Sequence, residues 1–215
     1  MDPEFWHQKW HNAELGFHLP QVHPLLQRYL GELSLEAGQT VFLPLCGKTL
    51  DIGYLLEQGY HVIGAELSEK AVSDLFASLD YPPDLAPWQG GNRYRHGSLT
   101  VFQGDIFALQ PGELGAVDAI YDRAALIALP DAMRERYANH LMALTDKAPQ
   151  LLITLEYDQQ QMDGPPFSVG EQQVQTLYGA GYSIESLSRK MILDHEPFFR
   201  ERGLTALYEN VFLLT

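Results

Sequence analysis

Strand-like apolar runs alternate with helical patterns along most of the chain, and this alternation limits its possible folds more than any other feature. Apolar runs bounded by Gly, Pro or polar residues predict strands at residues 40–45, 61–67, 99–103, 117–122, 150–156, 182–193 and 204–214. Helical spacing of apolar residues predicts helices at residues 49–58, 68–79, 131–144 and 170–178. Such alternation favours an α/β fold, with an open, mostly parallel sheet covered by helices on both faces.

Three segments lie outside this simple alternation. Residues 81–96 are rich in Pro and Gly, which predicts a loop. The connection between the last two predicted strands is short, which favours an antiparallel pair at the sheet edge. Residues 1–38 contain Trp, Phe and His without a strand pattern, so we expect a lid or cap there. The length of 215 residues and the absence of a recognisable linker predict a single domain that spans residues 1–215.

The composition limits the partners of this chain. Its 215 residues carry a formal net charge of −14 and no Lys/Arg run, so DNA or RNA would be repelled overall. No run of 18 apolar residues is present, and the first residues lack the basic and apolar regions of a signal peptide. Cys46 is the only cysteine, which excludes an internal disulfide and a cysteine-cluster metal site. We therefore expect a monomeric cytoplasmic protein that acts on a small molecule, without a nucleic-acid or membrane partner.

The candidate site lies at the ends of four predicted strands. In an open α/β sheet, ligands bind beyond the carboxyl ends of the strands, near the point where the strand order reverses. The residues at these ends are Pro44-Leu45-Cys46-Gly47-Lys48, Glu66, Asp105-Ile106 and Asp122-Arg123. The first turn lacks both the G-x-G-x-x-G pattern and the P-loop spacing, so a dinucleotide pyrophosphate is poorly served. A nucleoside without phosphates remains compatible with this turn, because Gly47 allows a close approach of the backbone.

Each acidic residue at these strand ends has a functional interpretation and a structural alternative. Glu66 lies 19 residues after the glycine of the first turn, a spacing at which a carboxylate can accept hydrogen bonds from ribose hydroxyls; the alternative is a solvated acid. Asp105 can accept from an adenine amino group while Ile106 packs on the ring; the alternative is a turn or N-cap residue. Asp122 and Arg123 adjoin apolar sequence, which favours either a ligand-bound pair or a structural salt bridge.

Aromatic residues near the N-terminus can contribute to a binding site. Trp6 and Trp10 share one face of a predicted helix and could close over a flat ligand or a sulfonium cation; the alternative is a helix packed on the sheet. His7 and His11 also share a face, but no third ligand lies nearby, so we expect no metal site. Cys46 is interpreted as a small buried residue, because no adjacent His supports a nucleophile role.

Several longer motifs resemble one known family over nearly the whole chain. They are Phe5-Trp6 with Trp10, Phe17-His18, Val41–Lys48 (VFLPLCGK), Val62–Ser68 (VIGAELS), Asp118–Leu126 (DAIYDRAAL), Glu156-Tyr157-Asp158, Gly164–Phe167 (GPPF), Tyr208-Glu209 and Phe212–Thr215. In these motifs the chain is similar to the thiopurine S-methyltransferase family in its bacterial form. The PLCGK turn is highly specific, because most class I methyltransferases have a first motif that is richer in glycine.

The resemblance implies a fold, a cofactor and a set of contacts. The implied fold is a three-layer, Rossmann-like class I methyltransferase with a seven-stranded sheet in the order 3-2-1-4-5-7-6, strand 7 antiparallel, and an N-terminal helical lid. The implied cofactor is S-adenosylmethionine, whose product is S-adenosylhomocysteine. Its implied contacts are Trp10, Leu45, Glu66 and Arg123, with Trp6, Gly47, Asp105 and Ile106 as further contacts. Phe17, Pro166 and Arg123 are implied at the acceptor pocket, and Phe198 stands where some family members have a basic residue.

The implied reaction is methyl transfer to the sulfur of a small aromatic or heterocyclic thiol, such as a thiopurine. We expect Arg123 to stabilise the acceptor anion, and Asp122 to orient Arg123 or to accept a proton. Three alternatives stay open at this point: a nicotinamide-dependent oxidoreductase, which the first turn disfavours, a non-catalytic S-adenosylmethionine-binding sensor, and a methyltransferase for selenium or tellurium species. The expected partner is therefore a small-molecule thiol or selenium acceptor.

Overall fold

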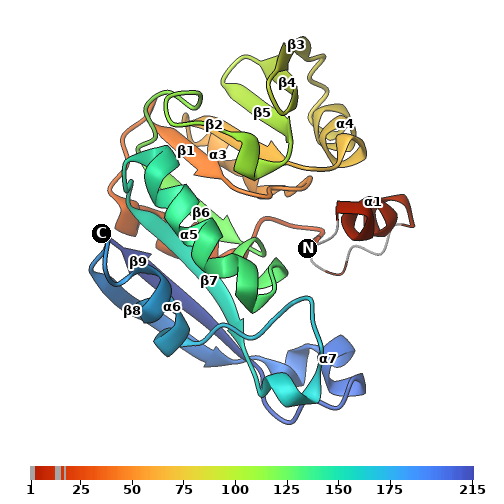
Figure 1. The fold of residues 1–215 in the computed structure, drawn as a ribbon, viewed down its shortest axis with the longest axis vertical. Helices are drawn as coiled ribbons and strands as arrows, with labels where there is room; N and C mark the ends of the chain where they lie inside the picture. The colour runs from red at the N-terminus through yellow and green to blue at the C-terminus, as the bar shows by residue number, and fades with distance from the viewer. Residues whose placement is uncertain (1–2, 13–15, 17) are drawn as a thin grey trace.

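The computed structural model describes residues 3–12, 16 and 18–215, which contain one mixed sheet of nine strands (Figure 1). The strand order is β3-β4-β5-β2-β1-β6-β7-β9-β8. The parallel centre consists of β5 (Leu99–Gly104), β2 (His61–Glu66), β1 (Thr40–Leu43), β6 (Ala119–Arg123) and β7 (Gln150–Glu156). Beyond β7 lies β9 (Tyr208–Leu214), antiparallel to β7, and beyond it β8 (Ile184–Met191), antiparallel to β9. The expected fold class is confirmed, and these seven strands have the order 3-2-1-4-5-7-6.

The prediction of a loop at residues 81–96 is wrong. The strands β3 (Asp84–Trp88) and β4 (Gly91–His96) form an antiparallel hairpin, and β4 pairs with β5, so the sheet has nine strands rather than seven. The Pro and Gly residues that indicated a loop have positional roles in this hairpin. Pro87 lies on the edge strand, where a missing N–H is tolerated. Gly91, at a φ of 156°, lies so close to the Gln103 carbonyl that a Cβ would collide with it.

Helices cover both faces of the sheet and complete the three layers. They are α3 (Asp51–Glu57), α4 (Glu69–Ser78), α5 (Asp131–Thr145) and α6 (Glu171–Tyr178). Tyr137 of α5 and Val174 of α6 belong to one buried core, whereas Leu55 of α3 and Phe76 of α4 belong to the core on the other face. The α4 helix begins as predicted, because the Ser68 hydroxyl accepts a hydrogen bond at its first turn.

The N-terminal segment divides into two parts. Its elements are α1 (Pro3–His11), α2 (Pro24–Tyr29) and the 3₁₀ turn η1 (Leu30–Leu33). Leu26 of α2 and Leu33 of η1 are buried with Val41 on the face that α3 and α4 cover, so this part of residues 1–38 belongs to the core. The α1 helix lies beside α4, away from the sheet (Figure 1). Residues 24–33 are therefore part of the core rather than of a lid, and for α1 the lid stays a prediction.

A small satellite core lies in the connection between β8 and β9. The connection contains the 3₁₀ turn η5 (Leu193–His195) and the helix α7 (Pro197–Glu201). Three further 3₁₀ turns lie elsewhere in the described residues: η2 (Ile106–Ala108), η3 (Leu126–Ala128) and η4 (Gln159–Gln161). Leu193, Leu204 and Leu207 pack there with Tyr157, which follows β7. The last two strands are shorter than predicted, while their antiparallel pairing is confirmed. In the described part of the chain, no helix combines the length and the apolar character needed to cross a membrane.

Candidate functional site

A cavity of about 450 Å³ opens at the carboxyl ends of β1, β2, β5 and β6. The sequence predicted that the ends of these strands would meet, because parallel strands place their carboxyl ends on one edge of the sheet. All the residues predicted to contact the cofactor line this one cavity. They are Trp6, Trp10, Leu45, Gly47, Glu66, Asp105, Ile106 and Arg123.

The Glu66 side chain joins the end of β2 to the first turn. It is only 5% exposed; its Oε2 accepts from the Gly47 N–H (2.8 Å) and its Oε1 from the Ser68 N–H (2.7 Å). Burial raises the pKa of Glu66 above its usual value, while these backbone donors oppose the shift. A carboxylate has about four acceptor positions. Two of them therefore remain for a ligand in the cavity.

Left-handed backbone occurs at three positions of the cavity wall. Leu45, Gly47 and Ala124 all line it, and all three have left-handed φ angles, of 47°, 55° and 61°. This conformation is costly for Leu and Ala, and such residues cluster at sites where the backbone must present groups to a ligand. Cys46, between the first two, is buried against Gly64 of β2, and burial raises the pKa of its thiol. The predicted structural role of Cys46 agrees with this environment.

The residues that follow β5 form an apolar part of the cavity wall. Asp105 caps η2, because its Oδ1 accepts from the Phe107 N–H (3.0 Å), and the residue remains exposed. The predicted turn role is therefore observed, and it coexists with a position on the cavity wall. From α5, His140 Nε2 lies 2.8 Å from the Ile106 carbonyl, and the Arg136 guanidinium lies 3.9 Å from the centroid of the Phe107 ring. These supporting residues were not predicted, because only the fold brings α5 to this loop.

Aromatic and cationic residues also line the cavity. Trp10 is 3% exposed, and the Lys48 Nζ lies 6.0 Å from the centroid of its ring. Lys48 also forms an ion pair with Asp74 (3.0 Å). His18 lines the cavity too, and burial lowers its pKa, reinforced by the charges of Lys48 and Arg123. The Phe17-His18 motif was a sequence signal for this part of the site, but only Phe17 was predicted to be a site residue. The predicted acceptor contact Phe17 lies outside the described residues.

Arg123 ends β6, near a hydrogen-bonded pair, Tyr121 and Asp51, that was not predicted. Its half-buried guanidinium has no hydrogen-bond or ion-pair partner within the residues that the structure describes. Beside it, the Tyr121 hydroxyl donates to Asp51 Oδ2 (3.1 Å), and Asp51 Oδ1 accepts from the His23 N–H (2.7 Å). Tyr121 and Asp51 both line the cavity. From the sequence alone, Tyr121 is interpreted as one more apolar strand residue, and Asp51 as a residue in the first turn of the helix predicted at 49–58.

Asp122, predicted to orient Arg123, lies on the other face of the sheet. The residue is 0% exposed and is not among the residues that line the cavity. Its Oδ1 accepts from the Leu126 N–H (3.1 Å) and its Oδ2 from the Tyr137 hydroxyl (2.8 Å), and burial raises its pKa to about 6. Consecutive side chains of a strand point to opposite faces, so the side chains of Asp122 and Arg123 diverge and Asp122 cannot orient Arg123 by a direct contact.

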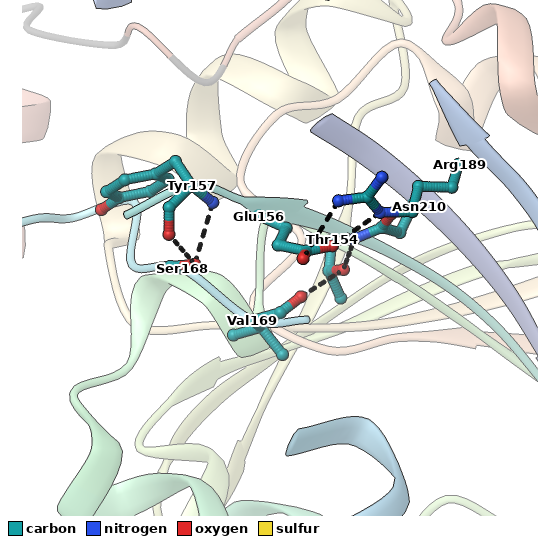
Figure 2. A network of polar contacts seen from close by, with 7 residues as sticks. All are labelled: Thr154, Glu156, Tyr157, Ser168, Val169, Arg189 and Asn210. Carbon is teal, nitrogen blue, oxygen red and sulfur yellow. Dashed lines mark hydrogen bonds and ion pairs between the residues drawn. The ribbon is translucent and has the colours of Figure 1, made fainter. Parts of the chain in front are cut away.

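Pro166, predicted at the acceptor pocket, does not line the cavity. Its carbonyl accepts from the Tyr157 hydroxyl (2.6 Å), and the neighbouring Phe167 N–H donates to the Ile127 carbonyl (2.7 Å). Figure 2 shows how the same loop is fixed to β7 and the residue after it: the Ser168 hydroxyl donates to the Tyr157 carbonyl, and the Thr154 hydroxyl donates to the Val169 carbonyl. The loop thus supports η3, which borders the cavity, rather than forming its wall.

The chain is similar to known proteins over its whole length. The family model "Thiopurine S-methyltransferase" matches residues 1–215. A thiopurine S-methyltransferase of Pseudomonas paraeruginosa is 51% identical over 215 residues, covering 100% of this chain and 99% of the relative, and one of Xanthobacter autotrophicus is 50% identical over 188 residues, covering 87% and 88%.

Solved structures show the same fold at low identity. The 1,6-didemethyltoxoflavin-N1-methyltransferase of Burkholderia thailandensis, solved with S-adenosylhomocysteine, superimposes with a TM-score of 0.65 at 15% identity, covering 99% of this chain and 86% of that chain. A SAM-dependent methyltransferase of Anabaena variabilis superimposes with a TM-score of 0.63 at 14% identity, covering 99% and 95%. The sequence match extends over the whole chain, and the fold and the first turn agree with it. The chain therefore belongs to the thiopurine S-methyltransferase family.

Proposed function

We propose that this protein transfers the methyl group of S-adenosylmethionine to the sulfur of a small aromatic or heterocyclic thiol. One observation carries the proposal: a single cavity combines the buried carboxylate of Glu66, the apolar wall at Ile106 and the guanidinium of Arg123. Family membership supports the same reaction. A volume of about 450 Å³ lies within the usual size range of small-molecule sites.

The residues of the cavity fit S-adenosylmethionine part by part. Glu66 keeps acceptor positions that suit the two ribose hydroxyls. Ile106 and the exposed carboxylate of Asp105 suit the face and the amino group of adenine. The buried ring of Trp10 suits a sulfonium cation, because aromatic faces attract positive charge. The left-handed turn at Leu45 and Gly47 brings the backbone close to whatever the cavity holds.

The chemistry requires positioning more than it requires acid–base groups. When bound, S-adenosylmethionine supplies a methyl group that is already activated for in-line displacement. Arg123 attracts the acceptor sulfur as a thiolate, because a nearby cation lowers the pKa of a thiol. His18 is neutral near pH 7, since its pKa is lowered by burial and by the charges of Lys48 and Arg123, and its ring can receive a hydrogen bond from the acceptor. The α1 helix, with Trp6 and Trp10, closes the cavity and excludes water.

Asp122 enters this mechanism as a supporting residue. Its carboxylate holds the Leu126 N–H and the Tyr137 hydroxyl. These hydrogen bonds fix the backbone on the far side of Ala124, whose left-handed φ turns the chain after Arg123. Asp122 therefore maintains the position of Arg123 through the main chain, and it is not the proton acceptor, because it does not line the cavity.

The experiment is a panel of acceptors with S-adenosylmethionine that carries a labelled methyl group. Thiopurines, thiophenols, selenite and catechols are offered separately, and the labelled products are identified by mass spectrometry. The proposal predicts label on the sulfur of thiopurines or thiophenols. Label on catechols and not on thiols would overturn the sulfur assignment, whereas label on selenite alone would make the protein a selenium methyltransferase. Binding of the cofactor without transfer to any acceptor would indicate a sensor.

We also propose that the reaction takes place in the cytoplasm and that the protein works as a monomer. The single cysteine, Cys46, is buried and free, as expected where thiols are kept reduced. Size-exclusion chromatography with light scattering measures the oligomeric state directly.

A further inference from the structure

One wall of the cavity contains a buried carboxylate that the mechanism above does not use. Asp51 is 1% exposed and lines the cavity. Among the described residues no cation pairs with it: its two oxygens accept from the His23 N–H and from the Tyr121 hydroxyl. A buried charge without a counter-ion is costly. Its position on a cavity wall therefore points to a ligand that supplies the missing positive charge.

The hydrogen-bond direction at Tyr121 gives this wall a definite polarity. The single phenolic hydrogen is donated to Asp51 Oδ2, at 3.1 Å. The hydroxyl oxygen consequently keeps only lone pairs for other partners. Burial raises the pKa of Tyr121 well above its usual value, and the Asp51 charge adds to the effect, so the phenol stays protonated and the arrangement persists. Asp51 and Tyr121 together form a pole that accepts hydrogen bonds and carries negative charge, called here the acceptor pole.

A pole of the opposite sign lies next to it. Arg123 is close enough to affect the pKa of the Tyr121 hydroxyl, and it acts on His18 together with Lys48. Arg123 and Lys48 thus place positive charge beside the acceptor pole, within one cavity. Adjacent poles of opposite sign match a zwitterion, with its anionic group toward Lys48, since Arg123 is assigned to the acceptor thiolate, and its cationic group at the acceptor pole. An α-amino acid end is such a zwitterion.

We propose that Asp51 and Tyr121 bind the α-ammonium group of the methionyl part of S-adenosylmethionine. This assignment rests on the proposed function, because it presumes that the cavity holds this cofactor. Asp51 supplies the charge and orients the phenol, and Tyr121 supplies an acceptor oxygen. The geometry gives the pair one specific consequence: it should recognise the amino group of the ligand and be indifferent to the rest.

The test compares ligands that differ in this one group. Binding is measured by isothermal titration calorimetry for S-adenosylhomocysteine, for its analogue without the α-amino group and for its analogue without the α-carboxylate. The Asp51→Asn variant keeps the side-chain shape and an oxygen for the His23 N–H. Its amide would donate to the Tyr121 oxygen, which would free the phenolic hydrogen to face the ligand and would reverse the polarity of the pole. Tyr121→Phe removes the hydroxyl and keeps the ring.

The expected pattern is selective. Asp51→Asn should weaken S-adenosylhomocysteine and the decarboxylated analogue by about tenfold or more, the usual effect of losing a charge-assisted hydrogen bond, and should leave the deaminated analogue nearly unchanged. Tyr121→Phe should show the same pattern with a smaller factor. Asp105→Asn, which changes another acid of the same cavity, should weaken the aminated and deaminated ligands by equal factors.

The outcomes separate the two proposals. If the unmodified protein does not bind S-adenosylhomocysteine, the proposed function fails. If it binds, but Asp51→Asn and Tyr121→Phe weaken the aminated and deaminated ligands equally, or not at all, the assignment of the acceptor pole is wrong. Circular dichroism establishes that each variant is folded. If Asp51→Asn does not fold, Tyr121→Phe decides the question, because it leaves the buried carboxylate and its contact with His23 in place.

Discussion

Asp122→Asn should change how the stability of the protein depends on pH. Burial raises the pKa of the Asp122 carboxyl from 3.8 to about 6. Between these two values the folded chain holds a proton that the unfolded chain has released, so the free energy of unfolding falls as the pH rises through this interval. A shift of about 2 pKa units corresponds to about 3 kcal/mol at 1.36 kcal/mol per unit. The cost is absent well below pH 4 and complete above about pH 6.

The Asp122→Asn variant cannot ionise at this position, so its own stability should lack this fall. The free energy of unfolding of the variant minus that of the unmodified protein should increase by about 3 kcal/mol from low pH to pH 7.5, and roughly half of this increase should occur above pH 5. Any constant difference from the altered contact with Tyr137 shifts both ends equally and does not affect the slope. Urea titrations at a series of pH values measure it.

Tyr137→Phe provides the companion measurement. The Tyr137 hydroxyl donates to Asp122 and stabilises its ionised form, so its removal should move the interval of falling stability to higher pH. A difference between the Asp122→Asn variant and the unmodified protein that stays constant from pH 5 to pH 7.5 would refute the reasoning, because it would mean that the buried carboxyl titrates alike in the folded and unfolded chains.

Three further predictions concern the cavity and its support. Glu66→Gln should weaken S-adenosylhomocysteine by about tenfold or more, since a charge-assisted hydrogen bond contributes about 1.5–3 kcal/mol, while Glu69→Gln on the exposed side of the next helix should not; equal titration curves for both variants would contradict the ribose assignment. Arg123→Ala should lower kcat/KM for an aromatic thiol by an order of magnitude or more, and Arg123→Lys should retain part of the activity. The control Arg95→Ala, at an exposed site, should lose none. Full activity of both Arg123 variants would exclude a role of Arg123 in stabilising the acceptor anion. Gly64→Ala should reduce the free energy of unfolding by about 1–3 kcal/mol, because a Cβ would lie 2.7 Å from the Cys46 Sγ. Adding Cys46→Ala should recover part of this loss in urea titrations. A Gly64→Ala variant as stable as the unmodified protein would show that the contact is loose.

The sequence predicted the central sheet and much of the cavity for a shared physical reason. Strands buried on both faces are continuous apolar runs, so β1, β2 and β7 were recognisable from their residues alone. Once parallel strands are assigned, their carboxyl ends must share one edge, which brings Leu45, Glu66 and Asp105 together without any knowledge of side-chain positions.

The missed features depend on contacts between distant segments. The β3–β4 hairpin contains Pro and Gly, which indicate a loop unless one knows that Pro87 lies on an edge and that Gly91 faces the Gln103 carbonyl. The hydrogen bond between Asp51 and Tyr121 joins residues 70 positions apart. No local pattern reports such a pair. Asp122 was placed beside Arg123 because the two are neighbours in sequence, whereas the pleat of a strand separates such neighbours.

The β3–β4 hairpin determines how firmly the cavity wall that follows β5 is held. Without β3 and β4, the strand that leads into Asp105 would be the outermost of the sheet, with half of its backbone groups facing solvent. With the hairpin in place, β5 is bonded along both sides, and fraying of the sheet margin begins two strands farther out. The loop after β5 is thus anchored like an interior element, and the two acids that face the cavity from β2 and from β5 keep a fixed separation.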